Sequence, residues 1–148
     1  MSYQSATGYA GDLLAIDAYW LLVSDATSIL IDVRTRAEWA YVGAPDFQAL
    51  GKVPYFLEWQ SYPSMHVDQQ FASRLGATLE SASVERGAPL VFLCRSGARS
   101  RHAAIAMTGA GWARCYNVSD GFEGSLDDSG RRGGACGWKA AGLPWVQS

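Results

Sequence analysis

The chain has 148 residues, of which 49% are hydrophobic, so it is long enough to bury a sizeable core. Lys and Arg number 12 against 14 Asp and Glu, a formal net charge of -2. This balance excludes the overall basic character of a protein that binds nucleic acid or an anionic membrane surface. We therefore expect a single domain over residues 1–148 that binds neither nucleic acid nor a membrane.

The N-terminal residues 1–8 have no basic start and no continuous apolar stretch, so they predict no secretory signal. No later run is long and apolar enough to predict a membrane-spanning helix. The three cysteines are odd in number and form no Cys-x-x-Cys pair, which argues against a disulfide framework and a zinc site. These features favour a cytoplasmic protein without a metal or another cofactor.

The first predicted element is a helix around residues 16–23, followed by a strand over Ser28–Val33. The strand is short and apolar without alternation, which is typical of a parallel strand buried on both faces. The helix has apolar residues at helical spacing, and we expect that face to cover the sheet. These residues are Ile16, Tyr19, Trp20 and Val23.

A short helix is predicted to begin after Thr35, because Thr35 and Glu38 have the spacing of a capping box. In that arrangement each side chain accepts a hydrogen bond from a backbone N–H that the helix leaves free. The segment Val42–Pro63 is rich in Gly and Pro and predicts a loop, with at most one short strand near Val53.

The next helix is predicted from Val67, Phe71 and Leu75, which share one face. A second apolar run, Pro89–Cys94, predicts another strand buried on both faces. Since helices and strands alternate along the chain, the connection rules predict an α/β fold with a mostly parallel sheet.

An Ala-rich helix is predicted over Ser100–Ala110, with Gly111 as its C-terminal cap. A weaker strand, Cys115–Val118, follows it. The tail, residues 120–148, is rich in Gly and predicts irregular structure. We expect this tail to pack down on the domain through two aromatic side chains, Trp138 and Trp145.

The segment after the second strand carries the candidate chemistry. Ligands of open α/β sheets bind beyond the carboxyl ends of strands, which is where Cys94 stands, directly ahead of a helix. Backbone N–H groups and the helix dipole are expected to converge on its sulfur and keep it ionised as a nucleophile. The other candidate residues of this loop, which would surround a bound sulfur or anion, are Arg95, Ser96, Gly97, Ala98, Arg99 and Ser100.

Gly97 is expected to adopt a positive φ, and Arg95 and Arg99 to stabilise the Cys94 thiolate. Two arginines so close to an apolar strand end are costly unless an anion or an acidic side chain accompanies them. Asp32, at the end of the neighbouring strand, is interpreted either as a turn former or as a partner of an arginine around the loop.

Among the remaining candidates, Cys115 is expected to pack in its strand and Cys136 to lie in a surface loop. His102 is expected on the helix outside the loop. Trp59 is the residue of the long loop that we expect to act as a lid or a pocket wall.

Four segments together resemble the rhodanese family. Cys94-Arg95-Ser96-Gly97-Ala98-Arg99-Ser100, between a strand and an Ala-rich helix, resembles its active-site segment. The other matching segments follow the family's order and are Asp32–Trp39, Gly111–Gly124 and Gly137–Pro144. Two departures occur: Tyr41–Pro45 replaces the commoner His-Ile-Pro-Gly form, and Gln48–Pro63 is longer than in minimal members.

The resemblance implies a three-layer α/β/α fold around a central, largely parallel five-stranded sheet. It also implies a thiosulfate sulfurtransferase, in which Cys94 takes a sulfane sulfur from thiosulfate or a related donor. The Cys94 persulfide would pass the sulfur to a thiol, a thiol protein or cyanide, while Arg95 and Arg99 bind the donor's oxyanion. Asp32 and Arg34 of the first matching segment would support the site.

Two alternatives to an active sulfurtransferase remain open. One is a non-catalytic rhodanese-like module that binds or regulates a partner. The other is a phosphatase or arsenate reductase, since these enzymes also use a cysteine loop that ends in arginine. Only four residues separate Cys94 from Arg99, whereas phosphatases of related fold have a longer loop that makes a wider cradle.

Overall fold

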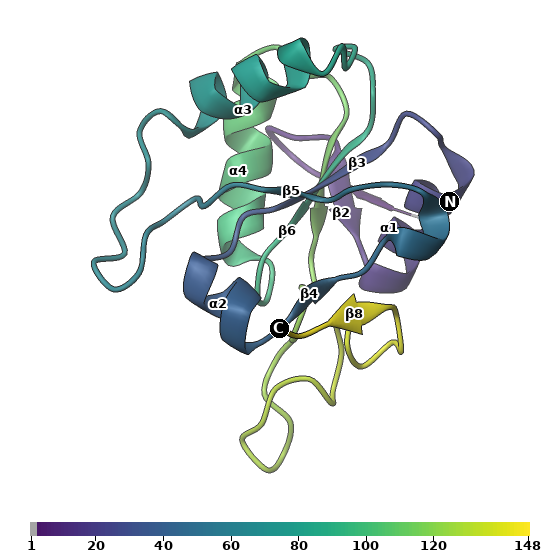
Figure 1. Cartoon of the computed structure of the whole chain (residues 1–148), viewed down its shortest axis with the longest axis vertical. Helices are drawn as coiled ribbons and strands as arrows, with labels where there is room; N and C mark the ends of the chain where they lie inside the picture. Colours follow the sequence, from purple (N-terminus) through teal and green to yellow (C-terminus); the bar gives the residue numbers. More distant parts are fainter. Residues whose placement is uncertain (1–2) are drawn as a thin grey trace.

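A mainly parallel sheet forms the middle layer of the protein, whose structure, a computed structural model, describes residues 3–148 (Figure 1). Within this central sheet every neighbouring pair of strands is parallel except the first, which is antiparallel. In spatial order the strands are β1 (Gln4–Ser5), β2 (Gly11–Leu13), β7 (Cys115–Val118), β6 (Leu90–Leu93), β3 (Ile29–Asp32) and β5 (Tyr55–Phe56).

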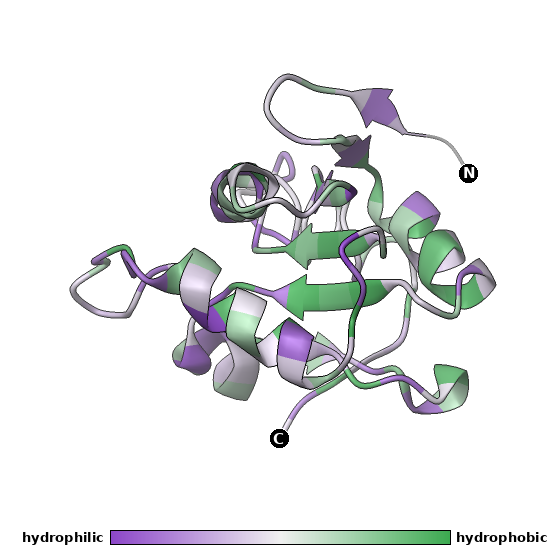
Figure 2. Cartoon of the chain, turned by 90° about the horizontal axis from the view of Figure 1, so that it is seen from above, coloured by the Kyte–Doolittle hydropathy of each residue, from purple (hydrophilic) through white to green (hydrophobic). Residues whose placement is uncertain are grey.

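Helices cover both faces of this sheet. The bounds are α1 (Ala15–Ser24), α2 (Arg36–Tyr41), α3 (Phe71–Ser81) and α4 (Ala98–Gly109), with a 3-10 turn at Gln48–Leu50. Helices α3 and α4 pack together on one face, and α1 packs on the other with the C-terminal tail. The central strands are hydrophobic and lie between these layers (Figure 2). The predicted three-layer α/β/α fold is therefore confirmed.

The predicted strands lie where the sequence indicated. β3, β6 and β7 occur within one residue of their expected ends, and all four residues of β6 and of β7 are buried. β5 and β2 complete five parallel strands, although the sequence did not indicate β2. β1, also not indicated, adds a short antiparallel edge and makes the sheet six-stranded rather than five-stranded.

The predicted apolar face of α1 is wrong for three of its four residues, and only Tyr19 packs against the core. Ile16, Trp20 and Val23 are largely exposed, with Trp20 at 60% of its free surface. The residues that pack on the sheet are Ala15, Ala18, Leu21 and Leu22. The helix has apolar residues on all its sides, so their spacing does not single out one buried face. The side that carries the small alanines packs on the sheet because it allows the closest approach.

The other helices follow the sequence more closely. The capping box of Thr35 and Glu38 at the start of α2 is confirmed. Helix α3 buries Phe71 and Leu75, but Val67 lies before the helix in an isolated bridge to Gln60, so its assignment to the helical face is wrong. Helix α4 begins two residues before the predicted start.

The segment predicted as loop contains two short strands, β5 just after the expected position and β4 (Ala44–Pro45). β4 pairs with β8 (Trp145–Val146), which ties the C-terminal tail to the domain (Figure 1). Trp138 is fully buried and Trp145 is partly exposed, so the tail packs down as predicted. No helix in residues 3–148 is long and apolar enough to cross a membrane.

Candidate active site

Cys94 lies directly after β6 and ahead of α4, at the wall of a cavity of about 700 Å³. Its side chain is buried, and its Sγ accepts a hydrogen bond from the backbone N–H of Gly97 at 3.1 Å. The hydroxyl oxygen of Ser100 lies 3.1 Å from the same sulfur. The residues of the loop therefore supply one backbone and one side-chain contact to a sulfur at the N-terminal end of α4.

Gly97 fixes the turn of this loop. It is the N-cap of α4 with φ 104°, a conformation that side chains resist, as the sequence predicted. A Cβ at this position would collide with the carbonyl oxygen of Ser119. The segment after β7 also braces the loop, because the N–H of Phe122 donates to the carbonyl oxygen of Cys94 at 2.8 Å. The backbone of Cys94 is thus held from the segment after β7, while the Gly97 N–H contacts its sulfur.

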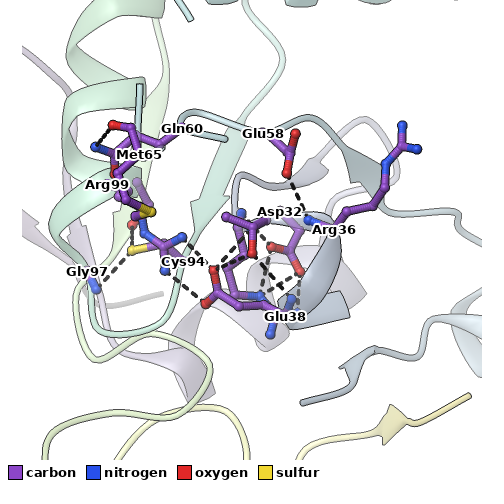
Figure 3. A network of polar contacts seen from close by, with 12 residues as sticks. Asp32, Arg36, Glu38, Glu58, Gln60, Met65, Cys94, Gly97 and Arg99 are labelled. Carbon is purple, nitrogen blue, oxygen red and sulfur yellow. Dashed lines mark hydrogen bonds and ion pairs between the residues drawn. The ribbon is translucent and has the colours of Figure 1, made fainter. Parts of the chain in front are cut away.

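Arg99 pairs with Glu38 of α2, at 2.6 and 2.9 Å between guanidinium nitrogens and carboxylate oxygens (Figure 3). Burial opposes ionisation of Glu38, but the hydrogen bonds and charge of Arg99 outweigh burial and lower the pKa of Glu38. Burial likewise opposes the charge of Arg99, yet contact with Glu38 raises the pKa of Arg99. The hydrogen bonds of Arg99 therefore go to a carboxylate, and the stabilisation of the Cys94 thiolate by its charge stays a prediction.

Arg95, Ser96 and Ala98 line the cavity, and the Arg95 side chain is exposed. The carbonyl oxygen of Arg95 accepts hydrogen bonds from the N–H groups of Glu123 and Gly124. Arg95 therefore presents a positive charge beside the cavity that no acidic side chain within residues 3–148 pairs with, while its backbone holds the loop.

Asp32 and Arg34 form a fully buried ion pair, with 2.7 Å between Arg34 Nη2 and Asp32 Oδ2. Arg34 also donates to the carbonyl oxygen of Gly43, and its guanidinium lies 4.2 Å from the centre of the Phe122 ring. Asp32 thus pairs with an arginine, but with one after its own strand and not one of the cysteine loop. This pair joins β3 to the segments before β4 and after β7.

The outer wall of the cavity combines apolar and charged side chains. Tyr41, Tyr62 and Met65 are exposed at the cavity, and Arg132 lines it from the tail. Trp59 does not line the cavity: it packs edge-on against Phe71 and stacks on His102. The expected role of Trp59 as lid or wall is therefore wrong, and its neighbours along the same loop occupy that place.

The other cysteines lie elsewhere. Cys115 is buried in β7, and burial raises the pKa of its thiol to about 11. Cys136 is partly exposed in the tail, with its sulfur 3.5 Å from the hydroxyl of Ser125. Residues 3–148 contain no group of three or more metal-ligating side chains suited to an ion.

The sequence did not predict that two polar residues, Glu38 and Asn117, are hydrogen-bond partners of the cysteine loop. Glu38 was assigned only to the capping box, although the same carboxylate also meets Arg99. Asn117 accepts a hydrogen bond from Ser100 at 2.6 Å while buried in β7. An amide in an otherwise apolar strand was the available signal, because a buried polar group requires partners.

A buried cysteine at the end of a central parallel strand, at a helix N-terminus and at a cavity, makes this an α/β protein with a candidate nucleophile. The model of the rhodanese-like domain family matches residues 16–128. The chain therefore belongs to the rhodanese-like domain family.

Relatives of known sequence and structure agree with this membership. Uncharacterized proteins of Rickettsia conorii and Rickettsia prowazekii are 39% and 36% identical over 134 residues, covering 90% of this chain and 95% of theirs. The crystal structure of Rv0390 from M. tuberculosis is 42% identical, with a TM-score of 0.83 over 95% of this chain and 99% of that one.

A more distant structure shares only the fold. The polysulfide-sulfur transferase homodimer from Wolinella succinogenes is 24% identical, with a TM-score of 0.57 over 93% of this chain and 78% of that one.

Proposed function

We propose that this protein is a sulfurtransferase that carries a sulfane sulfur as a persulfide on Cys94. The observation that carries the proposal is the placement of Cys94 Sγ at the cavity, with the Gly97 N–H directed to it from the first turn of α4. A helix N-terminus and its free N–H groups stabilise a negatively charged sulfur. Family membership favours the same chemistry.

In the first step the Cys94 thiolate attacks the outer sulfur of thiosulfate or a related donor. A new S–S bond forms to Cys94, the donor's S–S bond breaks, and sulfite departs with the electron pair. Because sulfite is stable as an anion, the step needs no general acid. Arg95, exposed at the cavity, is the side chain best able to bind the donor's oxyanion, and Arg99 adds charge that Glu38 partly offsets.

In the second step an acceptor thiolate or cyanide attacks the outer sulfur of the persulfide, and the Cys94 thiolate is regenerated as the leaving group. The cavity of about 700 Å³ is far larger than thiosulfate requires, and Tyr41 and Tyr62 give it an apolar rim. This room suits an organic thiol or the cysteine of a partner protein as acceptor. Turnover also requires reduced Cys94, which agrees with a reducing compartment such as the cytoplasm.

The proposal is tested by intact-mass and peptide mass spectrometry after incubation with thiosulfate. We expect the mass of one added sulfur on the Cys94 peptide, its loss on addition of cyanide with thiocyanate formed, and neither result with Cys94→Ser. Cys136→Ser is the matched control, and it should behave as the unaltered protein does. The absence of any adduct on Cys94 would favour the non-catalytic binding module.

An assay with an aryl phosphate distinguishes the proposed sulfurtransferase from a phosphatase. We expect negligible hydrolysis, because the loop of four residues between Cys94 and Arg99 leaves room inside it for a single sulfur atom and not for a phosphate group. Hydrolysis that is robust in the unaltered protein and lost in Cys94→Ser would assign the loop to a phosphatase instead.

A further inference from the structure

A chain of hydrogen bonds extends from Cys94 through the interior, away from the cavity. The Ser100 hydroxyl lies 3.1 Å from Cys94 Sγ and 2.6 Å from Asn117 Oδ1. On its other side, Asn117 Nδ2 donates to Asp12 Oδ1 at 3.1 Å, and Tyr9 donates its hydroxyl to the same oxygen at 2.9 Å. Ser100 and Asn117 are almost completely buried, so water does not replace these contacts.

The orientation of the Asn117 side chain follows from its contact with Asp12. A carboxylate oxygen only accepts hydrogen bonds, so the NH₂ group of Asn117 must face Asp12. Asp12 of β2 and Asn117 of β7 are direct partners in the sheet register, which keeps the two side chains opposed. The carbonyl oxygen of Asn117 is therefore the group that faces Ser100.

Ser100 has a single hydroxyl proton and two neighbours able to accept it. The distance of 2.6 Å to Asn117 Oδ1 is short for an O–H···O hydrogen bond, and an amide oxygen accepts better than a thiol sulfur. The proton therefore lies toward Asn117, and an oxygen lone pair faces the sulfur. A Cys94 thiol suits that lone pair because it can donate S–H. A Cys94 thiolate has no proton to donate to that lone pair. It gains a hydrogen bond from Ser100 only when the hydroxyl turns away from Asn117.

We infer that Asp12 and Asn117 are positioning residues that hold the Ser100 proton away from Cys94 and thereby set the pH at which this sulfur ionises. Asp12 orients the amide, the amide orients the hydroxyl, and the hydroxyl stabilises the thiol over the thiolate. This inference deepens the proposed function, since the thiolate is its nucleophile. It is tested by alkylation, which needs no sulfur transfer, so either idea can fail without the other.

The remaining charged groups around the cysteine loop stay unchanged in the test variants, so their fields cancel in each comparison. Burial and the hydrogen bond to Asp12 raise the pKa of Tyr9, which keeps that hydroxyl a donor across the working range. The charged groups that stay unchanged in the test variants are two ion pairs, Arg99–Glu38 and Arg34–Asp32, and three cavity-lining residues, Arg95, Glu123 and Arg132.

The test follows the rate of iodoacetamide modification of the Cys94 peptide against pH. Asn117→Leu removes the competing acceptor, and Asp12→Asn allows the Asn117 amide to reverse. We expect each to move the midpoint to lower pH by about half to one unit, the size of one redirected hydrogen bond. Ser100→Ala should also move the midpoint to lower pH, because it removes the lone pair that stabilises the thiol. Val118→Ala, on the opposite face of β7, is the packing control and should leave it in place.

Double variants separate the relay from a field effect. In a Ser100→Ala background, Asn117→Leu and Asp12→Asn should shift the midpoint no further, because the hydroxyl that transmits their effect is gone. A shift that persists in this background would assign the effect to the charge of Asp12 acting through space. An unchanged midpoint in both single variants would overturn the inference, and Asp12→Asn alone decides it if Asn117→Leu does not fold.

Discussion

Arg99 of the cysteine loop and Glu38 of α2 form an ion pair with 2.6 Å between Nη1 and Oε1, and both side chains are more than four-fifths buried. The contact spans 61 positions of sequence and joins the first turn of α4 to α2 at the cavity. The charge of Arg99 is thus balanced by Glu38 within the protein. Arg95 is the exposed cation of the loop, available to the proposed donor anion.

The pair predicts a specific loss of stability in acid. Because the folded protein lowers the pKa of Glu38, the pair's contribution is fully present above the ordinary Glu value, about 4.3, and disappears as pH falls through the lowered value. Glu38→Gln keeps a capping-box residue at this position but removes the charge. We expect it to cost about 1–3 kcal/mol at pH 7, measured by urea unfolding. The difference from the unaltered protein should shrink below pH 4; a difference that is constant with pH would contradict the prediction.

The three cysteines are predicted to differ in reactivity. Cys115 has a pKa of about 11 because of its burial, so its thiol stays protonated and unreactive near pH 8. Iodoacetamide should modify Cys94 and Cys136 in the folded protein and reach Cys115 only after denaturation, as read by peptide mass mapping. Modification of Cys115 at the rate of Cys136 would show that the core around β7 opens readily.

Gly97 is predicted to tolerate no side chain. Gly97→Ala combines a positive φ with a collision at Ser119, whereas Gly130→Ala has a similar φ with open space around it. We expect Gly130→Ala to cost about 1–2 kcal/mol, and Gly97→Ala to cost clearly more and to slow thiosulfate-dependent persulfide formation. Equal losses of stability in the two variants would show that the loop can move away from Ser119.

Removing only one partner of the buried Asp32–Arg34 pair is predicted to lower the free energy of unfolding more than removing both. Arg34→Met leaves a buried carboxylate without its partner, and we expect a loss of about 3–5 kcal/mol in unfolding experiments. The double change Asp32→Leu with Arg34→Met should recover much of that loss. Arg74→Met, which breaks a more exposed pair with Asp68, is the control and should cost under about 1 kcal/mol. A double variant as unstable as the single one would contradict this account.

Local sequence patterns predicted the fold well. The runs that became β3 and β6 are apolar on both faces, a pattern that suits a covered parallel strand wherever it occurs. The capping box before α2 and the positive φ of Gly97 are equally local, since they depend on neighbouring residues or on one backbone conformation. Cys94 was identified in the same way, from a strand end followed at once by a helix.

What the sequence left open concerns partners far apart along the chain. The buried side of α1, the carboxylate that meets Arg99 and the amide that meets Ser100 all depend on how the layers pack. The sequence by itself determined the main helices, the central strands and the candidate cysteine, because spacing and backbone conformation act over a few residues. Only the tertiary structure decided which charges and hydrogen bonds surround that cysteine, because α2, α4 and β7 meet only after the sheet has formed.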